Sequence, residues 1–353
     1  MNRLPPGPSR RRGPRPLALH LMLAAWRAMA AGATARCSPA SSNGSTGSSG
    51  ASRRWRSDEA AAQAEALARR LAASGHDPAE FGAAVVRELA RQDRALIAGI
   101  AAYRRHPWQR TLPDPPALWA EGGSRLLDYG ATASLPAGAR VLLVVPSLVN
   151  RAHVLDLLEG GSMLRWLAGQ GLRPLLLDWG WPGEVERRFT LTDYIAGRLE
   201  RALAFAASET GGPVLLAGYC MGGLLALAAA QRRPELVRAL AVLATPWDFH
   251  AGDPGRARAL AAALPLWEPA LAFAEALPVD LLQVLFAALD PFGVAAKYRA
   301  FARLDPDHPR ARLFVALEDW LNDGVPLAAP VARECLAGWY GRNEPARGLW
   351  RVA

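Results

Sequence analysis

Short runs of valine and leucine alternate with alanine-rich stretches through the middle of the chain. Each run is almost continuously apolar, which is typical of strands covered by helices on both faces. We expect strands at 140–145, 174–178, 213–217 and 239–244, with helices at 154–170, 191–208 and 222–232. This alternation of strand and helix predicts an α/β fold with a doubly wound, mostly parallel sheet.

Helical patterns flank this alternating stretch on both sides. Residues 58–74 have a helical composition, and the Asp-Pro-Ala-Glu sequence at 77–80 supplies an N-cap, an early proline and a capping-box glutamate. The helix that it opens should run to about Arg104. From 251 to about 340 the pattern is again helical, with a long apolar run over 264–289. This second helical region fits a cap over an active site or an ordinary packed subdomain, and both alternatives stay open.

Four regions follow from these patterns. Residues 1–57 form a basic and apolar N-terminal segment with a Ser/Gly-rich flexible linker, which cannot bury apolar surface. Residues 58–115 form a helical N-terminal region and residues 116–250 form the α/β core. Residues 251–353 form the helical cap region.

The sequence Gly-Tyr-Cys-Met-Gly-Gly at 218–223 joins an expected strand to an expected helix. Glycine is needed on both sides of Cys220, because a side chain would clash where the strand bends into the helix. The start of the helix directs its free N–H groups at the sulfur and favours the thiolate. This is the layout of the nucleophile elbow of α/β-hydrolases, with cysteine in place of serine. It predicts acyl transfer at Cys220; the alternative is an ordinary packed cysteine.

A nucleophile of this kind needs an oxyanion hole and a base. The backbone N–H of Met221 and that of Val149, in the loop after the first strand of the core, are the expected oxyanion donors. His250 and His308 are the histidines that follow Cys220. Neither follows a strand as the fold requires of a catalytic histidine. A loop-anchoring role fits His250, and turn chemistry fits His308.

Composition limits which binding partners and which cellular compartment we expect. The net charge of +9 suits an anionic partner, such as a nucleotide-bearing thioester, a phospholipid surface or nucleic acid. No nucleic-acid-binding motif is present, so we expect no nucleic acid partner. Dinucleotide and P-loop motifs are also absent, and we expect no cofactor and no metal. Cys37, Cys220 and Cys335 give no disulfide framework, which indicates a reducing, cytoplasmic location.

The apolar stretch 17–31 is too short and too polar to span a bilayer, because it contains His20 and Arg27. Its basic flank resembles that of a secretion signal, but Arg27 within the apolar part argues against export. An amphipathic helix on a hydrophobic surface and a plain core helix both fit. Whether the stretch acts as a targeting segment stays open.

An ordered set of blocks resembles the polyhydroxyalkanoate (poly-3-hydroxybutyrate) synthases, acyltransferases of the α/β-hydrolase superfamily that polymerise 3-hydroxyacyl-CoA. The resemblance runs from about residue 16 to the end of the chain. The blocks are Val145–Arg151 with Val154–Leu157, Leu164–Leu167 with Gly169–Gly171, Asp178–Pro182, Asp193–Ile195, Gly218–Gly223, Leu243–Phe249, Trp320–Gly324 and Trp339–Asn343.

The resemblance implies that Cys220 accepts the acyl group of 3-hydroxyacyl-CoA, with CoA leaving as part of the substrate. It also implies a growing polyester chain or granule surface as partner, and it allows a homodimer. The catalytic aspartate and histidine of the family follow further strands, and this chain ends at Ala353 before such a segment. An incomplete triad, weak or absent activity and an exposed apolar edge at 239–244 are therefore expected.

Two other functions remain open at this point. A cysteine-dependent hydrolase, such as an intracellular polyester depolymerase or a thioesterase, would share the elbow and the fold. A non-enzymatic protein that coats hydrophobic granules would use the basic, apolar N-terminal helix instead.

Overall fold

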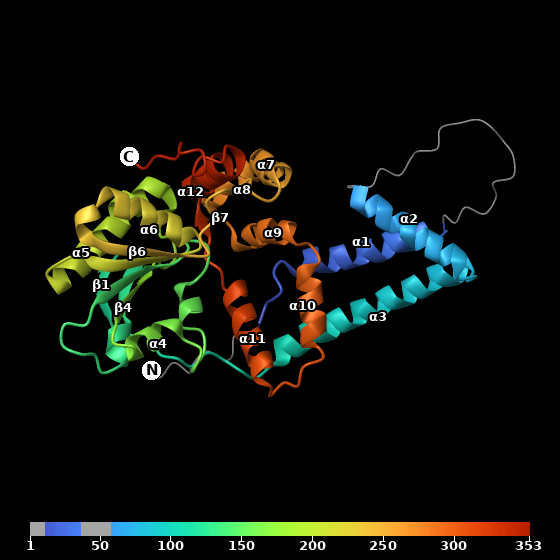
Figure 1. The fold of residues 1–353 in the computed structure, drawn as a ribbon, viewed down its shortest axis with the longest axis horizontal. Coiled ribbons are helices and arrows are strands. Elements are labelled where there is room, and N and C mark those ends of the chain that lie inside the picture. The colour runs from blue at the N-terminus through green and yellow to red at the C-terminus, as the bar shows by residue number, and fades with distance from the viewer. Residues whose placement is uncertain (1–10, 37–57) are drawn as a thin grey trace. The chain divides into compact units, whose positions relative to one another are not determined.

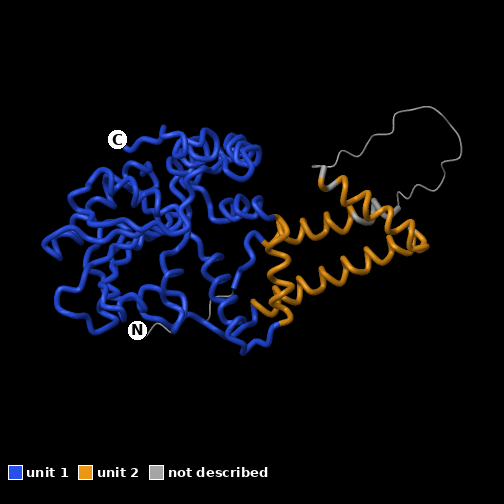
Figure 2. Tube along the Cα trace, viewed as in Figure 1, with its two compact units in different colours: residues 1–16, 104–290, 304–353 blue, residues 17–103, 291–303 orange. Residues whose placement is uncertain are grey.

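A computed structural model describes residues 11–36 and 58–353, which fall into two compact units (Figure 2). The first unit holds residues 1–16, 104–290 and 304–353, and the second holds residues 17–103 and 291–303. The predicted linker and Cys37 lie outside the described residues.

The second unit is helical. Its helices are α1 (Leu17–Arg36), α2 (Asp58–Ala73), α3 (Pro78–Arg105) and α10 (Gly293–Phe301). The helices predicted at 58–74 and from 77–80 to Arg104 are thereby confirmed. Tyr103 packs edge-to-face on Tyr298 with 5.6 Å between ring centroids. Arg27 pairs with Asp93 at 2.9 Å, which explains how an arginine is accommodated within the apolar stretch.

The first unit is built on a six-stranded sheet in the order β1-β2-β4-β3-β5-β6 (Figure 1). β3, β4, β5 and β6 run parallel to one another, while β1 and β2 form an antiparallel hairpin whose β2 pairs antiparallel with β4. The four predicted strands are confirmed; the hairpin was not predicted. The strands are β1 (Ala117–Glu121), β2 (Ser124–Asp128), β3 (Val141–Val145), β4 (Arg173–Asp178), β5 (Val214–Tyr219) and β6 (Val237–Leu243).

Helices cover both faces of the sheet, as its apolar strands require. α5 (Glu200–Thr210) and α6 (Met221–Arg232) pack on one face, and α4 (Met163–Gly169) packs on the other (Figure 1). Successive residues of β3 alternate between the two layers: Leu143 joins the α5/α6 core and Val144 joins the α4 core. This arrangement confirms the doubly wound fold.

Two predicted helices differ in detail from those observed. The helix expected at 154–170 is the shorter α4, because a 3₁₀ turn over Ala152–Leu155 precedes it and Ser162 caps it. The helix expected at 191–208 begins as a π-helix over Asp193–Leu199 and continues as α5. The helix expected at 222–232 is α6, which begins one residue earlier.

The remaining part of the first unit is mainly helical, as predicted. Its elements are α7 (Pro254–Ala262), α8 (Leu264–Ala274), β7 (Ala276–Leu277), α9 (Val279–Leu289), α11 (Pro309–Asn322), β8 (Leu327–Ala328), α12 (Ala329–Arg333) and a π-helix (Glu334–Gly341). Within the described ranges, no single helix is long and apolar enough to cross a membrane; α9 and α10 reach the required length and composition only as a bent pair.

β6 is an exposed apolar edge, as expected. Across the described residues it pairs only with β5. The side chain of Val242 is 52% exposed and that of Leu243 is 36% exposed. The outer backbone groups of β6 are therefore available to another strand.

Candidate active site

Cys220 occupies the sharp turn that the sequence predicts. β5 ends at Tyr219, α6 begins at Met221, and Cys220 between them has φ 53° and ψ −128°. A positive φ is costly for any residue with a side chain and is typical of functional sites. The N–H of Cys220 donates to the carbonyl of Leu243 at 2.8 Å, and its own carbonyl accepts from Gly223 at 2.9 Å. The thiol is partly exposed.

The glycines around Cys220 are required by close backbone contacts. A Cβ on Gly218 would overlap Gly223, and a Cβ on Gly222 would overlap the carbonyls of Val145 and Pro146. A Cβ on Gly223 would overlap the side chain of Thr245. The predicted need for glycine on both sides of the cysteine is confirmed.

The loop after β3, residues 146–151, begins against the first turn of α6, where Gly222 meets the carbonyl of Pro146. The N–H of Val149 donates to Ser147 Oγ at 3.3 Å, a long hydrogen bond within the loop. Met221 is the first residue of α6, where N–H groups have no acceptor in their own helix. The roles of Met221 and Val149 as oxyanion donors stay predictions.

The two histidines that follow Cys220 each make hydrogen bonds that stabilise a loop or a turn. His250 lies in the loop after β6, and its Nε2 is 2.8 Å from the carbonyl oxygen of Tyr340. The same loop is tied to Asn343, which accepts from the N–H of Phe249 and donates to Asp248. His250 is therefore a loop anchor, as expected.

His308 is part of a turn and a helix cap, also as expected. Its N–H donates to the carbonyl of Asp305 at 3.1 Å. Its Nδ1 accepts from the N–H of Arg310 at 3.1 Å, at the start of α11.

Two tyrosines lie within electrostatic reach of Cys220, and the sequence reasoning missed both in this role. Burial raises the pKa of Tyr340, and negative charge on Cys335 and Cys220 raises it further. Burial and the neighbouring Cys220 likewise raise the pKa of Tyr219. Both phenols therefore stay protonated and remain hydrogen-bond donors. Tyr219 stood inside the elbow motif and Tyr340 inside a Trp-Tyr block, but only the fold brings the second one to the cysteine.

Comparisons with known proteins found the following similarities. The α/β-hydrolase fold family matches residues 141–281. The chain is 31% identical over 232 residues to poly(3-hydroxyalkanoate) polymerase subunit PhaC of Allochromatium vinosum, covering 64% of each chain. It is 28% identical over 235 residues to the same subunit of Thiocystis violacea, again covering 64% of each. A solved structure of a proline iminopeptidase-related protein from Thermus thermophilus is 20% identical, with a TM-score of 0.34, over 66% of this chain and 74% of that chain.

The chain is therefore similar to poly(3-hydroxyalkanoate) polymerases over 64% of its length, and it carries the α/β-hydrolase fold. It spans about 64% of the length of the first two curated relatives that it matches.

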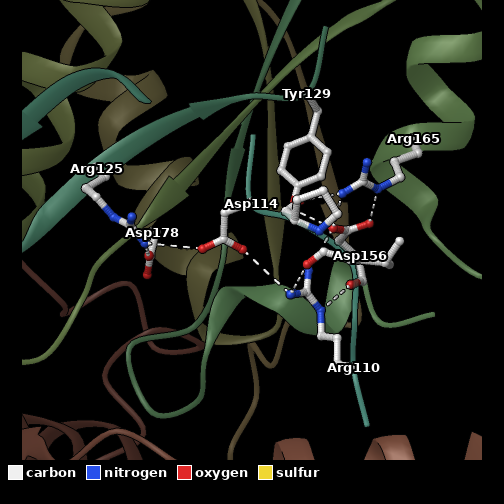
Figure 3. A network of polar contacts seen from close by, with 9 residues as sticks. Arg110, Asp114, Arg125, Tyr129, Asp156, Arg165 and Asp178 are labelled. Carbon is white, nitrogen blue, oxygen red and sulfur yellow. Dashed lines mark hydrogen bonds and ion pairs between the residues drawn. The ribbon is translucent and has the colours of Figure 1, made fainter. Parts of the chain in front are cut away.

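A buried ion network follows the loop that carries Val149 (Figure 3). The side chain of Asp156 is fully buried. It accepts hydrogen bonds from Arg165 at 2.8 and 3.0 Å, from Arg110 at 2.9 Å and from the Tyr129 hydroxyl at 3.1 Å. Three separate segments of the chain therefore converge on one carboxylate.

The charged form of Asp156 is favoured over its protonated form. Burial alone would raise the pKa of Asp156, but hydrogen bonds from Arg165 and Ser162 and the positive charges of Arg165 and Arg110 hold it below its usual value. Arg110 also donates to the backbone carbonyl of Asp156 at 3.1 Å. Figure 3 shows Asp114 between Arg110 and Arg125, with ion pairs of 3.6 and 3.8 Å. The network fixes the chain just beyond the proposed oxyanion loop.

A cleft of about 600 Å³ lies at the opposite end of the sheet, around the start of β3, β4 and β5. Arg140, Arg173 and Arg238 contribute to its lining. Because Cys220 follows the carboxyl end of β5, this cleft is separate from the candidate active site. Among the residues that the structure describes, no cluster of histidine, cysteine, aspartate and glutamate is arranged to hold a metal ion.

Proposed function

We propose that this chain transfers the acyl group of a 3-hydroxyacyl-CoA thioester to Cys220, as the first step of polyhydroxyalkanoate synthesis. The observation that supports this most directly is the strained backbone of Cys220, which presents a partly exposed thiol between β5 and the start of α6. Relatives named poly(3-hydroxyalkanoate) polymerase supply the substrate class.

The reaction proceeds in two acyl transfers. The Cys220 thiolate attacks the thioester carbonyl, a new C–S bond forms, and the bond to the CoA sulfur breaks so that CoA leaves as a thiolate and takes up a proton. A hydroxyl group of another 3-hydroxyacyl unit then attacks the acyl-enzyme. It loses its proton, a C–O ester bond forms, and Cys220 is released as thiolate.

Backbone groups at the elbow would stabilise the charge that develops in both steps. The first-turn N–H of Met221 and the N–H of Val149 are the proposed donors to the carbonyl oxygen as it becomes an oxyanion. The hydrogen bond from Val149 to Ser147 Oγ is long at 3.3 Å, so an oxyanion can replace it at little cost.

Two finer points of the family resemblance stay predictions for this chain. They are a homodimer and binding to a granule surface. In this proposal Cys220 and the elbow take part directly in the first acyl transfer. That transfer is therefore the step to test.

The test incubates the purified chain with 3-hydroxybutyryl-CoA and measures CoA release together with the product. We expect CoA release that Cys220→Ala abolishes and Cys335→Ala, a buried cysteine control, leaves intact. Ester oligomers as product support the polymerase function, and free 3-hydroxybutyrate indicates a hydrolase instead. CoA release by Cys220→Ala at the wild-type rate contradicts the proposal.

A further inference from the structure

The loop at 146–151 is held at both ends by tryptophan side chains from outside the loop. The Trp179 indole Nε1–H donates to the carbonyl of Pro146 at 3.0 Å. The Trp320 indole Nε1–H donates to the carbonyl of Arg151 at 2.7 Å. Both carbonyls belong to a loop with no regular secondary structure to satisfy them, so the indoles replace the missing backbone partners.

Both tryptophans are fixed by their own packing. Trp179 follows β4, is 7% exposed, and packs edge-to-face on Tyr194 with 5.5 Å between ring centroids. Trp320 lies in the last turn of α11, is 9% exposed, and packs in a small core with Leu157 and Ala316. Rigid donors of this kind limit the positions that the loop can take.

The segment that follows Trp320 adds further contacts to the same loop. The N–H of Val325 donates to the carbonyl of Val149 at 3.2 Å. Arg151 Nε lies 2.8 Å from Asp323 Oδ2, in an ion pair. A Cβ on Gly324 would come within 3.3 Å of Asn150 Oδ1, so this segment runs directly along the loop.

We propose that Trp179 and Trp320 are positioning residues for the oxyanion hole: their indoles clamp the two ends of the loop and so fix where the N–H of Val149 lies when it exchanges its hydrogen bond to Ser147 Oγ for one to the reacting carbonyl. This inference rests on the proposed function of Cys220. An oxyanion donor works only when it is preorganised, because a shift of about 1 Å in a catalytic group can cost about 100-fold in rate. Each indole N–H is engaged by a loop carbonyl, so in this proposal each tryptophan acts through the loop.

The test compares two reactions of the same thiol. Acylation by 3-hydroxybutyryl-CoA passes through an oxyanion, whereas alkylation by iodoacetamide displaces iodide at a saturated carbon and forms none. Trp320→Phe keeps an aromatic ring and removes the N–H donor. We expect it to slow acylation of Cys220 at least about 10-fold and to leave the alkylation rate unchanged. Trp179→Phe should act in the same direction.

Trp108→Phe is the matched control. Trp108 packs against the same small core as Trp320, and its indole makes no hydrogen bond to the loop. The inference is overturned if Trp320→Phe acylates at the wild-type rate, if it slows both reactions equally, or if Trp108→Phe slows acylation as much.

A separate readout distinguishes failure of this inference from failure of the proposed function. If wild-type Cys220 is alkylated but never acylated, the proposed function fails. Amide hydrogen exchange over 147–151 then decides whether the indoles hold the loop. Faster exchange in Trp320→Phe than in Trp108→Phe supports the clamp, and equal exchange in the two variants overturns it.

Discussion

At the scale of single residues, the close approach of neighbouring backbone segments at the elbow decides which side chains fit there. Cys220 has a positive φ, a conformation that costs of order 1–3 kcal/mol and persists only when neighbours enforce it. The enforcing contacts are the hydrogen bond from Cys220 to Leu243 and the glycines that let α6 approach β3. These glycines and the cysteine could be predicted from the sequence, because a six-residue motif encodes them. The proximity of Tyr340 could not, because it depends on a segment 120 residues away in the chain.

Gly222→Ala tests the close packing at the elbow. The added methyl would meet the backbone carbonyls of Val145 and Pro146, which cannot move without shifting β3. We expect a loss of about 3 kcal/mol or more in the free energy of unfolding, measured by urea denaturation. Gly169→Ala is the control, because nothing lies within 4 Å of its added methyl. Equal stability of the two variants would show that the elbow is not packed as described.

Asp156→Asn tests the buried ion network. It leaves Arg110 and Arg165 without their carboxylate, and we expect a loss of about 3–5 kcal/mol at neutral pH. The pKa of Asp156 is lower in the folded protein than its ordinary 3.8. Its stabilising contribution is therefore fully present above that value and is lost as the pH falls through the folded-state pKa.

The measurement is the difference in unfolding free energy between wild type and Asp156→Asn as a function of pH. It should be constant down to about pH 5 and shrink in stronger acid. Glu65→Gln is the control: Glu65 pairs with Arg69 on the exposed face of α2, and its loss should cost at most about 0.5 kcal/mol. A difference for Asp156 that is equal at acid and neutral pH would contradict the network's role.

At the scale of elements, short and nearly continuous apolar runs identified the four parallel strands β3, β4, β5 and β6, although β6 is exposed along most of its length. The β1–β2 hairpin was missed although Gly122-Gly123 between its strands is a hairpin turn sequence, and Gly122 has φ 55° there. The helix predicted at 154–170 was longer than the observed α4, because the apolar residues in this range favour a helix. The buried charge of Asp156 instead holds the first part of the range as a loop.

Val242→Lys tests the exposed edge strand. An unpaired apolar edge promotes association between copies, and a lysine on the edge suppresses it. We expect wild type to self-associate as its concentration rises and Val242→Lys to do so less, measured by sedimentation. Val185→Lys is the control, because Val185 is also exposed, at 64%, but lies outside the sheet. Identical association of wild type and Val242→Lys would eliminate β6 as the interface.

At the scale of the whole molecule, the net charge of the chain is basic, which suits the anionic thioester that we propose as substrate. The excess of basic over acidic residues gives the net charge of +9. Many arginines are nevertheless paired with carboxylates, as in the contacts of Arg165 with Asp156 and of Arg173 with Asp128. The sequence could predict the net charge and the position of Cys220 at the elbow, but not which basic residues are already engaged in holding the fold. The chemistry therefore has to be tested at the cysteine itself.

Peptide mapping by mass spectrometry after incubation with 3-hydroxybutyryl-CoA tests that chemistry most directly. A single 3-hydroxybutyryl thioester on the peptide that contains Cys220, with Cys335 unmodified, is the predicted result. A folded sample whose Cys220 reacts with iodoacetamide and yet carries no acyl group after incubation with the thioester would contradict the account.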